Sequence, residues 1–144
     1  MGKTSLYQNI LNILAKHFSE PDTRHKLDII PAFADGFENW FQIETIVKLI
    51  GNEIHASTLG KKTFDADIVV EYEGVEVGLE LRCWSGRGFT DNMLKALTDH
   101  PKADSYLFLF RNDDDKLSEL LGYLSEKDVL YKRLDSEWII MLVK

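Results

Sequence analysis

The fold of this chain is decided by residues 67–82, which read DIVVEYEGVEVGLELR. Apolar and polar residues alternate on both sides of Glu73-Gly74, which is the pattern of two β-strands that each bury one face. Because Glu73-Gly74 has the composition of a two-residue turn, we expect the strands to form a hairpin. Counting back from the turn places Asp67 directly opposite Glu80, on one face of the hairpin.

The segments around the hairpin predict an α/β domain, with helices packed on a mixed sheet. A second helix is expected to begin after a cap at Asp35, and residues 20–36 before it, which hold two prolines, are interpreted as a connector. The expected helices are residues 4–19, 37–50, 90–99 and 117–124, and the expected strands besides the hairpin are residues 53–58, 106–110 and 138–143.

Length and composition predict one domain over residues 1–144, since 144 residues with 44% hydrophobic side chains suffice for one core. The sequence shows neither an apolar run of about 20 residues nor a leader pattern, and its single cysteine forms no internal disulfide. We therefore expect a cytoplasmic protein with no membrane partner. The net charge of −7 repels polyanions and argues against a nucleic-acid partner.

The pairing of Asp67 with Glu80 suggests a site that binds a cation. Two carboxylates whose Cβ atoms are about 5 Å apart repel each other by roughly 3 kcal/mol at an effective dielectric constant near 20, so a positive charge should lie between them. Mg²⁺ meets this need, because it binds one or two carboxylates and keeps water and phosphate oxygens as its other ligands. Arg82 points to the same face, where its guanidinium group suits a phosphate.

Asp67, followed on the next strand by Glu80-Leu81-Arg82 and preceded by a helix that carries Glu44, resembles the PD-(D/E)xK nuclease superfamily. The resemblance covers residues 37–111. It implies a restriction endonuclease-like, three-layer core of order αβββαβ with a central mixed sheet, to which this chain adds an N-terminal helix and a C-terminal helix and strand. It also implies that Asp67, Glu80 and Glu44 bind the metal, Mg²⁺ or Mn²⁺, and that all three act in catalysis together with Arg82.

The chain departs from the family pattern at Arg82, where the family has lysine. A lysine can lose its proton in a suitable site, whereas arginine effectively never does, so Arg82 suits phosphate binding better than the role of a general base. Lys48, on the Glu44 side of its helix, or Lys95, on the helix after the motif, are alternative sources of an amine.

Each of these signals also has an ordinary structural interpretation. The carboxylates could lie on a solvated strand face with Arg82 bridging Asp65, and Glu44 with Lys48 has the spacing of an ordinary helical ion pair. The four histidines show no metal-ligand spacing, and a surface or capping role is expected for each.

Two functions therefore stay open, and a third possibility, an enzyme that cuts only within a larger assembly, would combine them. The first is a metal-dependent nuclease that hydrolyses phosphodiester bonds in nucleic acid, with DNA ahead of RNA as substrate. The alternative is a catalytically inactive nuclease-fold protein, an immunity or regulatory protein whose acidic surface binds a basic protein partner. The family resemblance also implies homodimers, for which we expect residues 138–143 to offer an edge strand.

Overall fold

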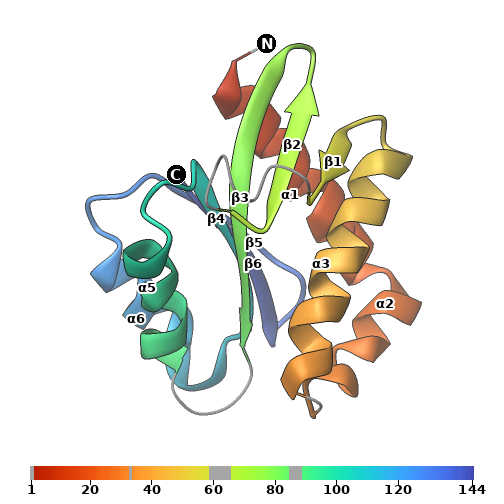
Figure 1. Cartoon of the computed structure of the whole chain (residues 1–144). Helices are drawn as coiled ribbons and strands as arrows, with labels where there is room; N and C mark the ends of the chain where they lie inside the picture. Colours follow the sequence, from red (N-terminus) through yellow and green to blue (C-terminus); the bar gives the residue numbers. More distant parts are fainter. Residues whose placement is uncertain (1, 33, 59–65, 85–88) are drawn as a thin grey trace.

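The computed structural model describes residues 2–32, 34–58, 66–84 and 89–144, which form an α/β protein (Figure 1). Its centre is an open, mixed sheet of six strands in the order β1-β2-β3-β4-β6-β5. Only β3 and β4 are parallel, and every other neighbouring pair is antiparallel. The strands are β1 (His55–Ser57), β2 (Ile68–Tyr72), β3 (Val75–Trp84), β4 (Ser105–Arg111), β5 (Val129–Arg133) and β6 (Trp138–Val143).

Helices cover both faces of this sheet. Figure 1 shows α1, α2 and α3 on one side and α5 and α6 on the other. The α-helices are α1 (Lys3–Ser19), α2 (Pro21–Lys26), α3 (Ala34–Gly51), α5 (Phe89–Asp99) and α6 (Lys116–Tyr123), and the short 3-10 helices are η1 (Ile30–Ala32) and η2 (Asp113–Asp115).

The hairpin register predicted from the sequence is confirmed. Ile68 lies opposite Leu79 and Tyr72 opposite Val75, with Glu73 and Gly74 between the strands. Both turn residues have positive φ, 50° and 81°, as a type I′ turn requires.

Alternation along the strands divides the core into two layers. One set of strand side chains, including Leu79 and Leu81, packs with Leu14 of α1 and Phe41 of α3. The other set, including Phe108, packs against α5 and α6. Glu80 lies between Leu79 and Leu81 in the chain, so its side chain points away from α1 and α3, to the face that α5 covers.

The expectations for the region before α3 were wrong in two respects. The stretch interpreted as a connector contains α2 and η1, and α3 begins at Ala34, so Asp35 lies inside the helix and does not precede it. The short α2 begins with Pro21 in its first turn, a position where proline is favoured because its missing N–H has no helical partner.

The C-terminal region also differs from expectation. The sequence predicted one strand there, but the structure has two, because β5 precedes β6. β6 lies between β4 and β5 in the sheet, so residues 138–143 are an interior strand and offer no edge for pairing with another chain.

Among the described helices, none has the length and apolar character needed to cross a bilayer.

Candidate functional site

Three side chains predicted from the sequence meet at the end of the hairpin away from its turn. Arg82 Nη1 lies 2.6 Å from Glu80 Oε1 and 3.9 Å from Asp67 Oδ2. Both carboxylates thus face one guanidinium group, and the expected convergence of Asp67 with Glu80 is present. The positive charge between them is provided by Arg82.

The strand ends explain how this group forms. The ladder between β2 and β3 ends at Ile68 and Leu79, so residues 80–84 of β3 extend past their partner strand. Asp67, just before β2, takes over the pairing with its side chain, because its Oδ2 accepts a hydrogen bond of 2.9 Å from the backbone N–H of Leu81. Asp67 therefore has a structural task as well as a place beside Glu80.

Glu80 is the most deeply buried member of the site, with 2% of its side chain exposed. Burial, reinforced by the adjacent Asp67 carboxyl and opposed by Arg82 and His100, raises the pKa of Glu80 to about 7. Its Oε2 atom is buried and has no hydrogen-bond partner among the residues that the structure describes. A buried acceptor without a partner is costly, so this oxygen is suited to hold a proton or to face a cation.

Arg82 links the sheet to helix α3. Its Nη1 atom also donates to the carbonyl oxygen of Leu81 at 3.0 Å and lies 3.4 Å from Glu38 Oε1. With 22% of its side chain exposed, the guanidinium group is reachable from solvent. The alternative that Arg82 bridges Asp65 concerns a residue outside the described part of the chain.

His100 is a further member that the sequence did not reveal. Its Nε2 atom lies 3.6 Å from Glu80 Oε1, and its carbonyl oxygen accepts a hydrogen bond of 2.7 Å from the Tyr106 hydroxyl. His100 follows the last residue of α5, so its approach to β3 depends on how that helix docks on the sheet. A lone histidine after a helix carries no sequence signal for such a contact.

The structure does not bring Glu44 into this group. Glu44 Oε2 lies 3.3 Å from His17 Nε2, between α3 and α1, whereas Glu38 is the α3 carboxylate that contacts Arg82. Of the two alternative amines, Lys48 pairs with Glu20 at 4.0 Å, and Lys95 is exposed on α5.

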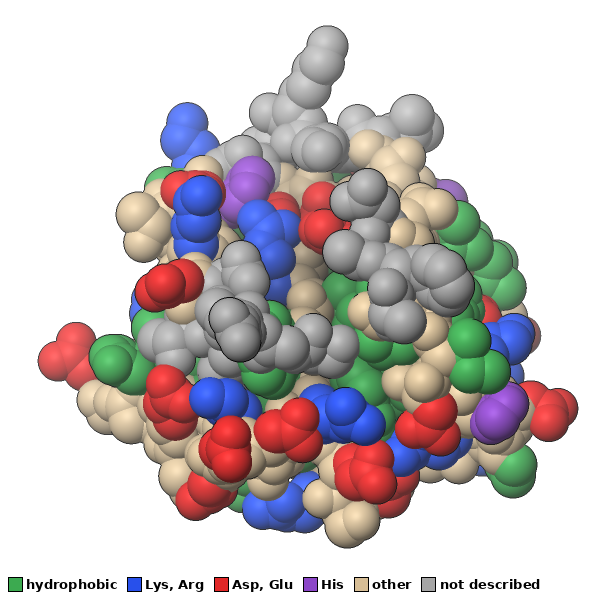
Figure 2. All heavy atoms as spheres, turned by 90° about the horizontal axis from the view of Figure 1, so that it is seen from below, with side chains coloured by type: hydrophobic (Ala, Val, Ile, Leu, Met, Phe, Trp, Pro, Cys, Tyr) green, Lys and Arg blue, Asp and Glu red, His purple; other side chains and the backbone are tan. Residues whose placement is uncertain are grey.

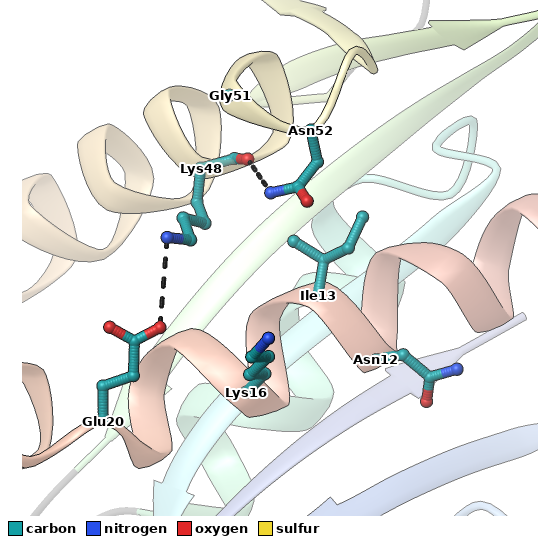
Figure 3. A pocket seen from close by; sticks show the side chains of 7 residues that line it. All are labelled: Asn12, Ile13, Lys16, Glu20, Lys48, Gly51 and Asn52. Atoms are coloured by element: carbon teal, nitrogen blue, oxygen red, sulfur yellow. Dashed lines mark hydrogen bonds and ion pairs between the residues drawn. The ribbon is translucent and has the colours of Figure 1, made fainter.

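A separate cleft of about 410 Å³ lies between α1 and α3. Figure 3 shows Lys48 turned towards Glu20, and the Asn52 amide donating to the Lys48 carbonyl oxygen at 2.9 Å. The residues that line this cleft are Asn12, Ile13, Lys16, Glu20, Lys48, Gly51 and Asn52. It shares no residue with the group around Arg82, which we call the carboxylate site: Glu38, Asp67, Glu80, Arg82 and His100.

The donors of the carboxylate site limit what it can bind. Within the described ranges, no cluster of three or more histidine, cysteine or acidic side chains is arranged to hold a metal ion. Asp67 and Glu80 offer two carboxylates, which is the number that Mg²⁺ uses when water and phosphate oxygens complete its shell. Within the described part of the chain no group pairs with Glu80 Oε2, so this oxygen can serve as a metal ligand, and these two residues fit such an ion once Arg82 moves aside.

Comparisons with protein-family models, with curated proteins and with solved structures found no match to this chain. The fold and the site therefore define an α/β protein with a buried, arginine-paired carboxylate, and the function has to be inferred from the residues themselves.

Proposed function

We propose that this chain has the PD-(D/E)xK core and is a metal-dependent nuclease that hydrolyses phosphodiester bonds in nucleic acid, with DNA ahead of RNA. The order α3-β1-β2-β3-α5-β4 supports the proposal, since it has the αβββαβ succession that the sequence resemblance implies. So does the parallel pairing of β3 with β4 through α5. The observation that carries the proposal is the convergence of Asp67 and Glu80 beside Arg82.

In this proposal Asp67 and Glu80 hold the metal ion, Mg²⁺ or Mn²⁺. The bound ion would lower the pKa of a water molecule and offset the charge of the phosphate. The raised pKa of Glu80, at about 7, means that cation binding competes with a proton at that carboxyl. We therefore expect metal binding to strengthen as the pH rises above 7.

Arg82 contributes phosphate binding, because its guanidinium group stays charged and presents several N–H donors. To bind a phosphate, the guanidinium group of Arg82 must leave Glu80. Glu38 is placed to receive this group, because its Oε1 atom lies 3.4 Å from Arg82 Nη1. We therefore assign the contribution of helix α3 to Glu38 as a positioning residue. Glu44, expected from the sequence to bind metal, keeps its contact with His17.

Calorimetric titration with Mn²⁺ near pH 8 tests the proposed ligands. We expect the wild-type protein to bind Mn²⁺, and both Asp67→Asn and Glu80→Gln to lower the affinity at least about tenfold, since each removes one of two charged ligands. Glu44→Gln is the matched control, because this carboxylate pairs with His17 and should leave binding unchanged. Absence of Mn²⁺ binding in the wild type, or binding that both ligand variants retain, would contradict the metal site.

A cleavage assay tests the activity itself. Single- and double-stranded DNA and RNA should be incubated with Mn²⁺ at low salt, where contacts between cationic side chains and phosphates are strongest. We expect cleavage by the wild type and background rates with Glu80→Gln. Equal rates for the two proteins would show that the site does not catalyse cleavage.

A second function, binding of a basic protein partner without catalysis, is favoured by a different observation. Arg82 already places a positive charge between the two carboxylates, at 2.6 Å from Glu80, which is what a metal ion would otherwise do. Figure 2 looks onto the end of the molecule at which β3 terminates, and the acidic and basic side chains of the described residues are interspersed there, without a continuous basic surface among them. A wild-type protein that neither binds Mn²⁺ nor cleaves nucleic acid would support this function over the first.

A further inference from the structure

We propose that the open edge of strand β5 binds an extended, acidic peptide segment of a partner protein, which pairs with it as a further strand of the sheet. β5 is the outermost strand on its side, because the strand order ends with β4-β6-β5. Within the described sheet, β6 occupies one edge of β5 and the other edge has no partner strand. Free backbone groups along a sheet edge are a template for another strand.

The pairing of β5 with β6 shows which backbone groups face the open edge. In an antiparallel pair, opposite residues alternate between those that exchange hydrogen bonds and those that do not. The Leu134 N–H donates to the carbonyl oxygen of Trp138, which lies opposite it, at 2.8 Å, so every second residue back along β5 bonds to β6 in the same way. The N–H and C=O groups of Val129, Tyr131 and Arg133 therefore point to the open edge, at the spacing that an added strand needs.

A hollow of about 270 Å³ lies beside this edge, between β5 and helix α1. Leu11 is buried and Leu130 packs on the core that α1 covers, so the hollow has an apolar wall. The amides of Gln8 and Asn12 and the ammonium group of Lys132 supply hydrogen-bond donors. The residues that line the hollow are Gln8, Leu11, Asn12, Leu130, Tyr131 and Lys132.

The hollow indicates which side chain the added strand would place there. Successive side chains of a strand point to opposite faces of the sheet, so every second side chain of the peptide would point to the side of α1. An apolar wall with donors around it suits a side chain that has an aliphatic stem and an anionic end. Glutamate has this form.

The charges around the edge also favour an acidic partner. Neither α1 nor β5 contains an aspartate or a glutamate, although the chain as a whole has 24 acidic and 17 basic residues. Among the described residues, Lys132 and Arg133 of β5 take part in no ion pair. The acidic residues around the strand include Asp128, just before it, and Asp135, which pairs with Arg24.

Two other occupants fit this edge less well. A second copy of the chain would bring together two strands that both carry Lys132 and Arg133, and lysine on an edge strand opposes such pairing. A nucleic acid would satisfy the cationic side chains, but its phosphates have no N–H groups for the outward carbonyl oxygens of β5. An acidic peptide supplies donors, acceptors and negative charge together. This binding does not depend on the nuclease proposal.

Fluorescence anisotropy with labelled peptides tests the chemistry of the partner. The probe is a peptide of about ten residues that alternates glutamate and threonine, and we expect the wild type to bind it with a dissociation constant on the order of 10–100 µM, as befits a small interface. Replacing every glutamate of the peptide with glutamine should weaken binding at least about tenfold, and so should Lys132→Glu in the protein.

Lys95→Glu is the matched control for this measurement, because it makes the same charge change at an exposed position of α5 and should bind the peptide as the wild type does. Absence of binding by the wild type, or equal affinity for the glutamate and glutamine peptides, would overturn the proposal.

A backbone variant separates strand addition from attraction between charges. Tyr131→Pro removes an N–H from the open edge and none from the ladder with β6, and proline is tolerated in an edge strand at such a position. We expect a variant that circular dichroism shows to be folded and that binds the glutamate peptide at least about tenfold more weakly. Undiminished binding by the folded variant would mean that charge alone attracts the peptide, which contradicts strand addition.

Amide hydrogen exchange followed by NMR tests the pairing on the unaltered protein. In the free protein, β6 should protect the N–H groups of Leu130 and Lys132, while those of Val129, Tyr131 and Arg133 exchange quickly. Saturation with the glutamate peptide should slow exchange at the three outward amides at least about tenfold and leave the other two unchanged. Unchanged exchange at the outward amides would rule out strand addition.

The other occupants are tested in the same preparation. A single-stranded DNA oligonucleotide should displace the glutamate peptide poorly, and sedimentation equilibrium should show no dimer that Tyr131→Pro abolishes. An oligonucleotide that binds this edge more tightly than the peptide, or such a dimer, would assign the edge to nucleic acid or to a second copy and would overturn the proposal.

Discussion

The free energy of unfolding of the wild-type protein should fall by about 3 kcal/mol between about pH 4.5 and pH 7. Replacing Glu80 with glutamine should abolish this fall. The cause is the buried position of this carboxyl, whose pKa is raised from 4.5 to about 7, first by burial and then by Asp67. In the unfolded chain the carboxyl recovers its ordinary pKa.

The sign of the effect follows from proton binding. Between pH 4.5 and pH 7 the folded protein keeps a proton on Glu80 that the unfolded chain has released. The contribution to stability is therefore fully present below the unfolded pKa and is lost as the pH rises through the folded value. Glutamine carries no charge at any pH, so the variant lacks this slope.

Urea unfolding near pH 4.5 and near pH 8 measures the effect. The stability difference between the wild type and Glu80→Gln should shift by about 3 kcal/mol between the two conditions, in favour of the variant at the higher pH. Glu76→Gln, at an exposed position of the same strand, is the control and should shift by less than about 0.5 kcal/mol. A parallel pH dependence of the wild type and Glu80→Gln would contradict the raised pKa.

Replacing Arg82 with methionine is expected to cost about 2–4 kcal/mol of stability near pH 8, because it leaves Glu80 buried and charged without its partner. The cost should be smaller near pH 5.5, where Glu80 holds a proton and needs the guanidinium group less. Urea unfolding at both pH values checks the size and the direction of the change.

A second arginine provides the comparison. Arg111 lies 3.8 Å from Asp113 and 3.7 Å from Glu137, and 39% of its side chain is exposed. Exposed ion pairs contribute little, so Arg111→Met should cost less than about 1 kcal/mol at either pH. Equal losses in Arg82→Met and Arg111→Met would show that the contact with Glu80 is no stronger than a surface pair.

Arg82→Met also separates the two functions considered above. If Asp67 and Glu80 bind a metal ion, millimolar Mn²⁺ should restore stability to this variant, since the ion then supplies the missing positive charge. The double variant Arg82→Met with Glu80→Gln should gain nothing from Mn²⁺. Failure of Mn²⁺ to stabilise Arg82→Met would argue for the non-catalytic function.

The hairpin could be predicted from sequence because its information is local. Alternation specifies which face is buried, and Glu73-Gly74 specifies the turn, so the register follows without knowledge of the remaining chain. The start of α3 and the strand β5 could not be found in this way. β5 is half-exposed at the edge of the sheet, and its place there depends on pairing with β6, which is a tertiary contact.

The parts of the site differ in the same way, because some are brought together by local strand pairing and others by the packing of a helix on the sheet. Asp67, Glu80 and Arg82 are brought together by the hairpin, so counting from the turn was enough to predict their meeting. The contribution of α3 depends on how that helix is placed over the sheet, and the family resemblance pointed to Glu44, although Glu38 is the carboxylate that reaches Arg82.

The interior position of β6 has a consequence for the timing of folding on the ribosome. β6 is synthesised after the other five strands of this sheet, yet β4 pairs with it along its whole length, and helix α1 packs against β5 and β6. Until β6 emerges, one edge of β4 lacks its partner and the apolar side of α1, including Leu6 and Leu14, lacks part of its cover. The hairpin and α3 can form early during translation, whereas this sheet is completed only when β6 has left the exit tunnel.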